Sequence, residues 1–111
     1  MNYYKNIEGE KILNLANEVD YHSGQIVSKT LIQNEALSMT LFSFAKGEEI
    51  STHESDGDAL VQVLEGKGVV LIDGKKYELK AGESIIMPAK KPHSVHGVEN
   101  FKMLLIVAFK K

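Results

Sequence analysis

Apolar and polar residues alternate along most of the chain. In residues 37–44, Phe42 and Phe44 fall on one face, whereas Met39 and Leu41 fall on the other. A period of two is typical of a β-strand, because successive side chains of a strand point to opposite faces. The predicted strands cover residues 26–32, 37–44, 58–64, 68–72, 75–79, 84–87, 93–98 and 101–109.

Turn-forming residues separate these runs. Asp73-Gly74 stands between two β-rich runs and predicts a tight hairpin, because both central positions of such a turn need positive φ. Lys80-Ala-Gly82 and Glu65-Gly-Lys-Gly68 also predict turns. Many short strands with glycine-rich turns, in a chain of 111 residues, predict an all-β sandwich or jelly-roll barrel.

One stretch departs from this pattern. Between Lys11 and Val19, apolar residues recur at spacings of three and four, at Ile12, Leu15, Ala16 and Val19. This is the period of a helix. We therefore predict a short N-terminal helix ahead of the strands.

Composition narrows the classes of protein. Hydrophobic residues make up 43% and charged residues 25%, which fits one globular domain over residues 1–111. The net charge is -2 and the charges are interspersed, so we expect no nucleic-acid partner. Cysteine is absent, so any metal must be held by nitrogen and oxygen ligands.

The chain also shows no membrane signal. Its first residues lack an apolar signal core, and no stretch approaches the ~20 apolar residues that span a bilayer. We expect a cytoplasmic location and no membrane partner.

Two motifs then stand out. The first runs from Gly47 to His53 and closes at Gly66 in Val63-Leu-Glu-Gly66, and the second runs from Gly82 through Pro88 to His93. Their combined spacing resembles the two motifs of the cupin family, over residues 37–109. The resemblance implies a double-stranded β-helix, also called a jelly-roll barrel, and a metal site of three histidines and one glutamate.

The motifs are incomplete in this chain. Ser55 stands where the family has its second histidine, and Ala59 stands where it has the glutamate. Lys90 replaces a motif glycine and Gly97 a motif asparagine. The resemblance therefore implies only His53 and His93 as metal ligands. Imidazole ligands suit a divalent transition metal such as Zn, Ni, Fe or Mn, and no organic cofactor is implied.

The nearby carboxylates that could complete the set are those of Glu54, Asp56 and Asp58, and His96 is a further candidate. Asp58 precedes the glutamate position, so in regular register it faces away, although a bulge at Gly57 would reverse this. Asp56 lies in a turn-like segment, and His96 stands at an odd offset from His93, on the opposite strand face. The sequence leaves open whether any of them binds metal.

The small residues Ser55 and Ala59 enlarge any cavity. If Val61, Val63, Ile86 or Met103 point inward, the result is an apolar pocket; otherwise side chains simply fill the barrel. The sequence thus predicts a small-molecule binding protein, with or without the metal.

Two alternatives stay open: a metal-dependent enzyme of dioxygenase or isomerase type, and a non-catalytic dimeric scaffold. Whether the protein is an enzyme is undecided from the sequence. A homodimer fits every reading, since the predicted edge strand at Val27–Ile32 needs covering.

Overall fold

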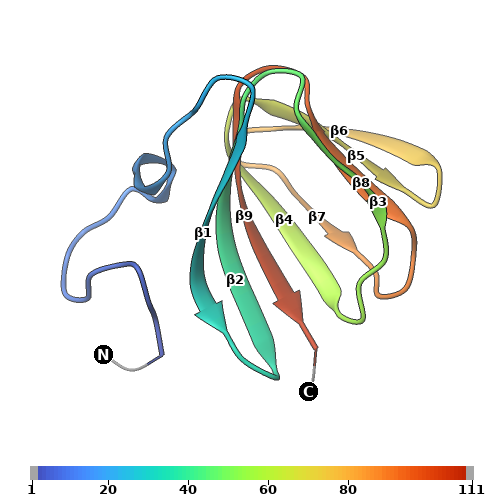
Figure 1. The fold of residues 1–111 in the computed structure, drawn as a ribbon. Helices are drawn as coiled ribbons and strands as arrows, with labels where there is room; N and C mark the ends of the chain where they lie inside the picture. The colour runs from blue at the N-terminus through green and yellow to red at the C-terminus, as the bar shows by residue number, and fades with distance from the viewer. Residues whose placement is uncertain (1–2, 110–111) are drawn as a thin grey trace.

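The computed structural model describes residues 3–109 and confirms an all-β fold. Its strands are β1 (Ile26–Gln33), β2 (Leu37–Phe44), β3 (Glu49–His53), β4 (Asp58–Glu65), β5 (Lys67–Ile72), β6 (Lys75–Lys80), β7 (Ser84–Met87), β8 (His93–Gly97) and β9 (Phe101–Ala108). They form a five-stranded sheet, in the order β1-β2-β9-β4-β7, and a four-stranded sheet, in the order β3-β8-β5-β6 (Figure 1). The two sheets share no hydrogen-bonded ladder among the described strands, so the barrel is not closed.

The predicted strands correspond closely to those observed, with one addition. β3 was not predicted, because its residues Glu49–His53 show no regular alternation. The Asp73-Gly74 hairpin is confirmed: both residues have positive φ, 51° and 82°, between the paired residues Ile72 and Lys75.

The predicted helix over Lys11–Val19 is wrong. Only a short 3-10 turn, η1 (Leu15–Glu18), forms there, and the Asn14 side chain accepts a hydrogen bond from the Ala16 backbone N–H at its start. Short helices are marginal unless packing holds them. Ile12, which would have lain on the apolar face of the predicted helix with Leu15 and Val19, is fully exposed. Within residues 3–109, no helix is long and apolar enough to span a membrane.

The main core lies between the two sheets. The rings of Phe44 and Phe101 pack there with their centroids 4.9 Å apart. Of the four residues whose direction the sequence left open, Val61, Val63 and Met103 are buried in the same core. Ile86 instead points outward and is 57% exposed, whereas its neighbours Ile85 and Met87 pack inward.

The N-terminal segment, residues 3–25, covers part of the outer face of the five-stranded sheet (Figure 1). Leu15 and Val19 of this segment pack against Leu31, Leu41 and Leu104 of the sheet. A second, smaller apolar cluster therefore lies on the side of the sheet opposite the main core.

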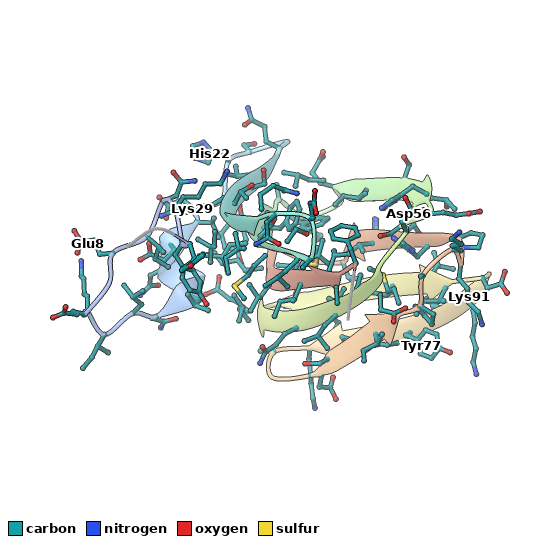
Figure 2. The ribbon with its side chains drawn as sticks, turned by 90° about the horizontal axis from the view of Figure 1, so that it is seen from below. Glu8, His22, Lys29, Asp56, Tyr77 and Lys91 are labelled. Carbon is teal, nitrogen blue, oxygen red and sulfur yellow. The ribbon has the colours of Figure 1, made fainter. Side chains whose placement is uncertain are left out.

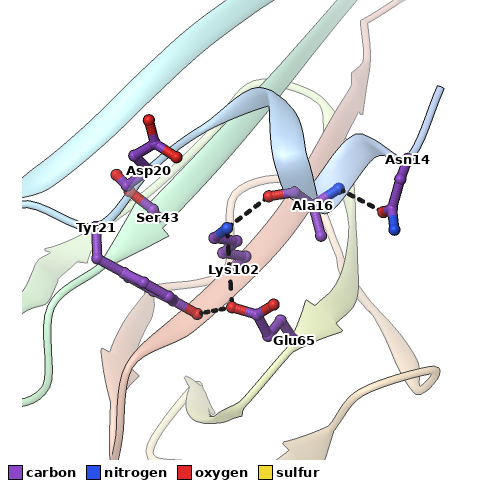
Figure 3. Close-up of polar contacts among 7 residues, drawn as sticks. All are labelled: Asn14, Ala16, Asp20, Tyr21, Ser43, Glu65 and Lys102. Atoms are coloured by element: carbon purple, nitrogen blue, oxygen red, sulfur yellow. Dashed lines mark hydrogen bonds and ion pairs between the residues drawn. The ribbon is translucent and has the colours of Figure 1, made fainter.

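A polar cluster anchors the same segment (Figure 3). Lys102 extends from β9, is 6% exposed, and donates a hydrogen bond to the Ala16 carbonyl oxygen. Its ammonium lies 3.8 Å from a Glu65 carboxylate oxygen and 4.8 Å from the centre of the Tyr21 ring. Tyr21 donates its hydroxyl proton to the same Glu65 carboxylate. We call Lys102, Glu65, Tyr21 and Ala16 the lysine cluster.

Candidate metal and ligand site

His53 and His93 face each other across two neighbouring strands. β3 pairs with β8 in antiparallel fashion, and the two histidines are directly opposed. Between the pairs Ile50–Val95 and His53–His93, β3 carries one residue more than β8, which is a β-bulge. In a regular strand Ile50 and His53 would point to opposite faces, but here both line the same cavity. The bulge therefore turns His53 inward.

The backbone fixes the protonation of both rings. His53 Nδ1 lies 2.9 Å from the Ser51 carbonyl oxygen, and His93 Nδ1 lies 3.0 Å from the Lys91 carbonyl oxygen. A carbonyl oxygen only accepts, so each neutral ring must carry its proton on Nδ1. The two Nε2 atoms, 3.2 Å apart, then direct lone pairs at each other. This arrangement favours a proton or a metal cation between them.

Burial favours the neutral form of His93. The residue is 2% exposed, and this burial lowers its pKa below the ordinary value of 6.5. The hydrogen bond to Lys91 and the charge of Glu54 oppose the shift, while His53 adds to it. A neutral imidazole with a free Nε2 lone pair is the form that binds metal.

The two histidines help to line an apolar cavity of about 160 Å³ between the sheets. Both residues that occupy the family's missing ligand positions, Ser55 and Ala59, line this cavity, as the resemblance implied. The sequence did not identify most of the remaining lining. It consists of Phe42, Ile50, Met87, Val95, Met103, Leu105 and Val107.

The candidates to complete the metal site lie elsewhere. Asp58 pairs in regular register with Ala108, without a bulge at Gly57, and its carboxylate accepts a hydrogen bond from the Ala89 N–H at 2.8 Å. Asp56 is exposed, and His96 pairs with Glu49 and Val69. Neither these three residues nor Glu54 line the cavity.

Two loops meet beside the histidines. The Lys90 N–H donates to the Ser55 carbonyl oxygen at 2.7 Å, which ties the loop after β7 to the loop after β3. Figure 2 shows Asp56 and Lys91, one from each loop, at the same end of the sheets, away from Glu8 and Lys29. Lys90 has a φ of 66°, a left-handed conformation that favours glycine. Lys90 stands where the family motif has a glycine, and this substitution was the indication in the sequence that the backbone here is strained.

The histidine pair has the spacing of two of the four ligands of a tetrahedral metal site. Two imidazole nitrogens bound to one tetrahedral Zn²⁺ at about 2.0–2.1 Å lie about 3.3–3.4 Å apart. The observed Nε2–Nε2 separation of 3.2 Å is close to this value. Among residues 3–109, no group of three His, Cys, Asp or Glu could hold a metal.

Known proteins share this architecture. A conserved protein of unknown function from Streptococcus pyogenes is 43% identical, with a TM-score of 0.97 over 100% of this chain and 97% of its own. A cupin superfamily protein from Desulfitobacterium hafniense is 36% identical, with a TM-score of 0.92 over 96% of this chain and 98% of its own.

A curated, uncharacterised protein from Methanocaldococcus jannaschii is 31% identical over 49 residues. The match covers 44% of this chain and 39% of that protein, so it spans about two fifths of the curated relative. The family model of the cupin domain matches residues 40–109. These residues contain both histidines, both motifs and eight of the nine strands, all but β1 in whole or in part. The chain belongs to the cupin domain family.

Proposed function

We propose that the protein binds a small molecule in the cavity between its sheets, oriented by a divalent metal at His53 and His93. The observation that carries this proposal is the pair of Nε2 atoms, 3.2 Å apart, with both Nδ1 atoms next to carbonyl oxygens. A hydrogen bond from the ring Nδ1–H to a backbone carbonyl oxygen orients a metal-binding histidine and fixes its tautomer. The apolar wall beyond the histidines suits an organic ligand.

Metal content of untagged protein, measured by mass spectrometry after incubation with Fe, Mn, Ni and Zn, tests the proposal. We expect near-stoichiometric metal in the parent and none in His53→Ala or His93→Ala. His96→Ala is the matched control, because His96 lies on the same strand as His93 but does not line the cavity. Absence of metal from the parent, or equal loss in all three variants, would overturn the metal site.

A metal-dependent enzyme, of dioxygenase or isomerase type, is the second candidate. It is supported by the small ligand set, since catalytic metal sites keep positions open for substrate or water. The discriminating measurement is recovery of a bound ligand after incubation with the Fe-, Mn- or Zn-loaded protein in air. Chemical conversion that is lost in His93→Ala would favour the enzyme, whereas unchanged ligand would favour the binding protein.

We also propose that the chain forms a homodimer. Part of the predicted edge is covered by the chain itself, because the Lys5 N–H and the Asn6 side chain donate to the Leu31 and Thr30 carbonyls. The better support is an apolar groove of about 420 Å³ under the N-terminal segment, next in sequence to the fully exposed Ile12. The residues that line the groove include Ile7, Leu13, Leu15, Leu31, Met39 and Leu104.

A protruding apolar side chain beside an apolar groove is self-complementary, as a two-fold interface requires. Light scattering coupled to size-exclusion chromatography should give a dimer mass for the parent and a monomer mass for Ile12→Ser. Ile86→Ser, which removes an exposed isoleucine from another strand, should stay dimeric. A monomeric parent, or a dimeric Ile12→Ser variant, would contradict the proposal.

A further inference from the structure

The apolar groove under the N-terminal segment is a second cavity, on the outer face of the five-stranded sheet. It measures about 420 Å³, compared with about 160 Å³ for the cavity between the sheets. Its lining is mostly aliphatic and includes Leu15, Leu31, Met39 and Leu104. Among the described residues that line it, Glu8 alone carries a charge. Ligand pockets typically measure ~300–1,000 Å³ and are mostly apolar, so the groove has the size and character of one.

A polar pocket of about 350 Å³ adjoins the groove, since Glu8 and Leu13 line both. Two ion pairs lie in it. Lys29 donates to the Glu18 carboxylate at 3.0 Å, and the ammonium of Lys11 lies 3.4 Å from a Glu8 carboxylate oxygen. The side chains of Lys29 and Glu18 are only 27% and 24% exposed. The pocket therefore holds balanced charges, and one of its pairs is largely removed from solvent.

We propose that these two cavities together bind a small amphiphile that has a single alkyl or acyl chain and a zwitterionic head. The chain lies in the apolar groove, and the head lies in the polar pocket next to Lys29 and Glu18. A flexible chain suits a groove with an aliphatic lining, because it buries CH₂ groups and brings no polar atom that would need a partner there.

The balance of charge in the pocket determines the head. The Lys29 ammonium has three N–H donors and uses one for Glu18, whose carboxylate keeps free lone pairs. A zwitterion can place its anionic group at Lys29 and its cationic group at Glu18, so both charges of the protein stay compensated. A purely anionic head would compete with Glu18 for the lysine, and a purely cationic head would compete with Lys29 for the carboxylate.

The same groove supports the homodimer proposed above. If Ile12 of a second copy enters the groove, the chain of the amphiphile takes its place, and the two compete. This coupling rests on the proposed homodimer, whereas the amphiphile site itself does not. Because linkage is reciprocal, the amphiphile should dissociate the dimer, and dimerisation should weaken binding of the amphiphile.

Calorimetric titration of the Ile12→Ser variant tests the site without the competitor. Ile12 is not among the residues that line the groove of its own chain, so the substitution leaves the groove intact. The ligands, all below their micelle concentrations, are decylphosphocholine, decanoate, decyltrimethylammonium and phosphocholine. We expect decylphosphocholine to bind at least about tenfold more tightly than each of the others. Equal affinity for phosphocholine would overturn the apolar chain, and equal affinity for decanoate or decyltrimethylammonium would overturn the zwitterionic head.

A pair of variants in the Ile12→Ser background tests where the chain lies. Leu13→Ser removes an apolar side chain that lines both cavities and lies outside every strand, and it should weaken decylphosphocholine binding at least about fivefold. Ile86→Ser is the matched control, because Ile86 is exposed on the same sheet but does not line the groove. Equal effects of the two substitutions would mean that the ligand adheres to exposed apolar surface, and would overturn the site.

A second pair of variants tests the head. Glu18→Gln leaves Lys29 without its carboxylate, so the preference should move from decylphosphocholine toward decanoate. Glu78→Gln is the control, because it breaks an exposed pair, with Lys67 at 3.5 Å, that lies outside both cavities. A merely structural role of Glu18 would weaken all four ligands alike. An unchanged preference in Glu18→Gln would overturn the placement of the head.

Light scattering coupled to size-exclusion chromatography separates the two proposals. Saturating decylphosphocholine should convert the dimeric parent to monomers. If the parent is monomeric without ligand and calorimetry gives the expected order of affinities, the homodimer is wrong and the amphiphile site stands. If the parent stays dimeric at saturating ligand, the chain does not occupy the groove, and the amphiphile site is overturned.

Discussion

Two polar clusters lie on opposite sides of the five-stranded sheet, the lysine cluster on its outer side and the histidine pair across the core, on the four-stranded sheet, and they differ in the partners around their atoms. In the lysine cluster, the Lys102 ammonium has a carbonyl oxygen, a carboxylate and an aromatic ring around it. In the histidine pair, the two Nε2 atoms lie 3.2 Å apart, and each Nδ1 atom lies next to a backbone carbonyl oxygen. A cluster of opposite charges stabilises the fold, whereas two imidazole nitrogens directed at each other beside a cavity suit the binding of a cation or a ligand.

The largest effect should come from the lysine cluster. Lys102→Ala removes a buried cation and its packing, and leaves the Ala16 carbonyl without that donor. We expect a loss of about 2–4 kcal/mol in the free energy of unfolding, measured with urea. Lys102→Met, which keeps the apolar stem, should lose less.

Lys80→Ala is the control, because Lys80 is an exposed lysine on β6. Its free energy of unfolding should change by at most about 0.5 kcal/mol. If Lys102→Ala were equally mild, the lysine cluster would not anchor the N-terminal segment, and the contrast with the histidine pair would fail.

The sequence revealed these two clusters unequally. His53 and His93 were identified from motif spacing, but the inward turn of His53 depends on a one-residue bulge that strand periodicity does not encode. Lys102 was missed altogether. Lys102 is a single charged residue in the apolar run Phe101–Ala108. From sequence alone, such a lysine is normally expected to lie exposed to solvent.

The secondary-structure predictions also divide into those that depend on local residues and those that depend on long-range contacts. The Asp73-Gly74 hairpin was predictable because two adjacent residues determine its backbone. The N-terminal helix failed because the path of that segment is set by distant contacts, from Leu15 and Val19 to the sheet and from Lys102 to Ala16. Local pattern predicts local structure, and it does not predict which long-range contacts prevail.

The next effect is a dependence of stability on pH in mild acid, which comes from His93. Burial lowers the pKa of His93 in the folded protein, whereas the unfolded chain keeps the ordinary value of 6.5. The unfolded state therefore binds more protons in acid, so this contribution to stability is complete above about pH 6.5 and is lost as the pH falls toward the lowered pKa.

Urea unfolding of metal-free protein between about pH 7.5 and pH 5 measures this loss. His93→Leu should flatten the curve, because no titrating group remains at that position. His22→Leu is the matched control, since His22 is exposed in a loop, and it should keep the slope of the parent. An unchanged slope in His93→Leu would show that His93 is as readily protonated in the folded protein as in the unfolded chain.

A smaller effect concerns the loop that borders the cavity. Lys90 adopts a φ of 66°, where a side chain is strained and glycine is not. Lys90→Gly relieves this strain but frees the unfolded chain, so we expect a net stabilisation of at most about 1 kcal/mol by thermal unfolding. Lys91→Gly, at the neighbouring exposed residue without positive φ, should destabilise instead.

The smallest effect should be that of removing His53 from the metal-free protein. His53 is exposed, and its Nε2 faces another lone pair, so its loss removes a repulsion together with one hydrogen bond to the Ser51 carbonyl. We expect His53→Ala to change the free energy of unfolding by about 0.5 kcal/mol or less. With Zn²⁺ present, the parent should gain stability as the free metal concentration rises, and His53→Ala should gain none. A large loss in the metal-free variant would mean that the pair already stabilises the fold, as the lysine cluster does, and that it is not prepared for a ligand.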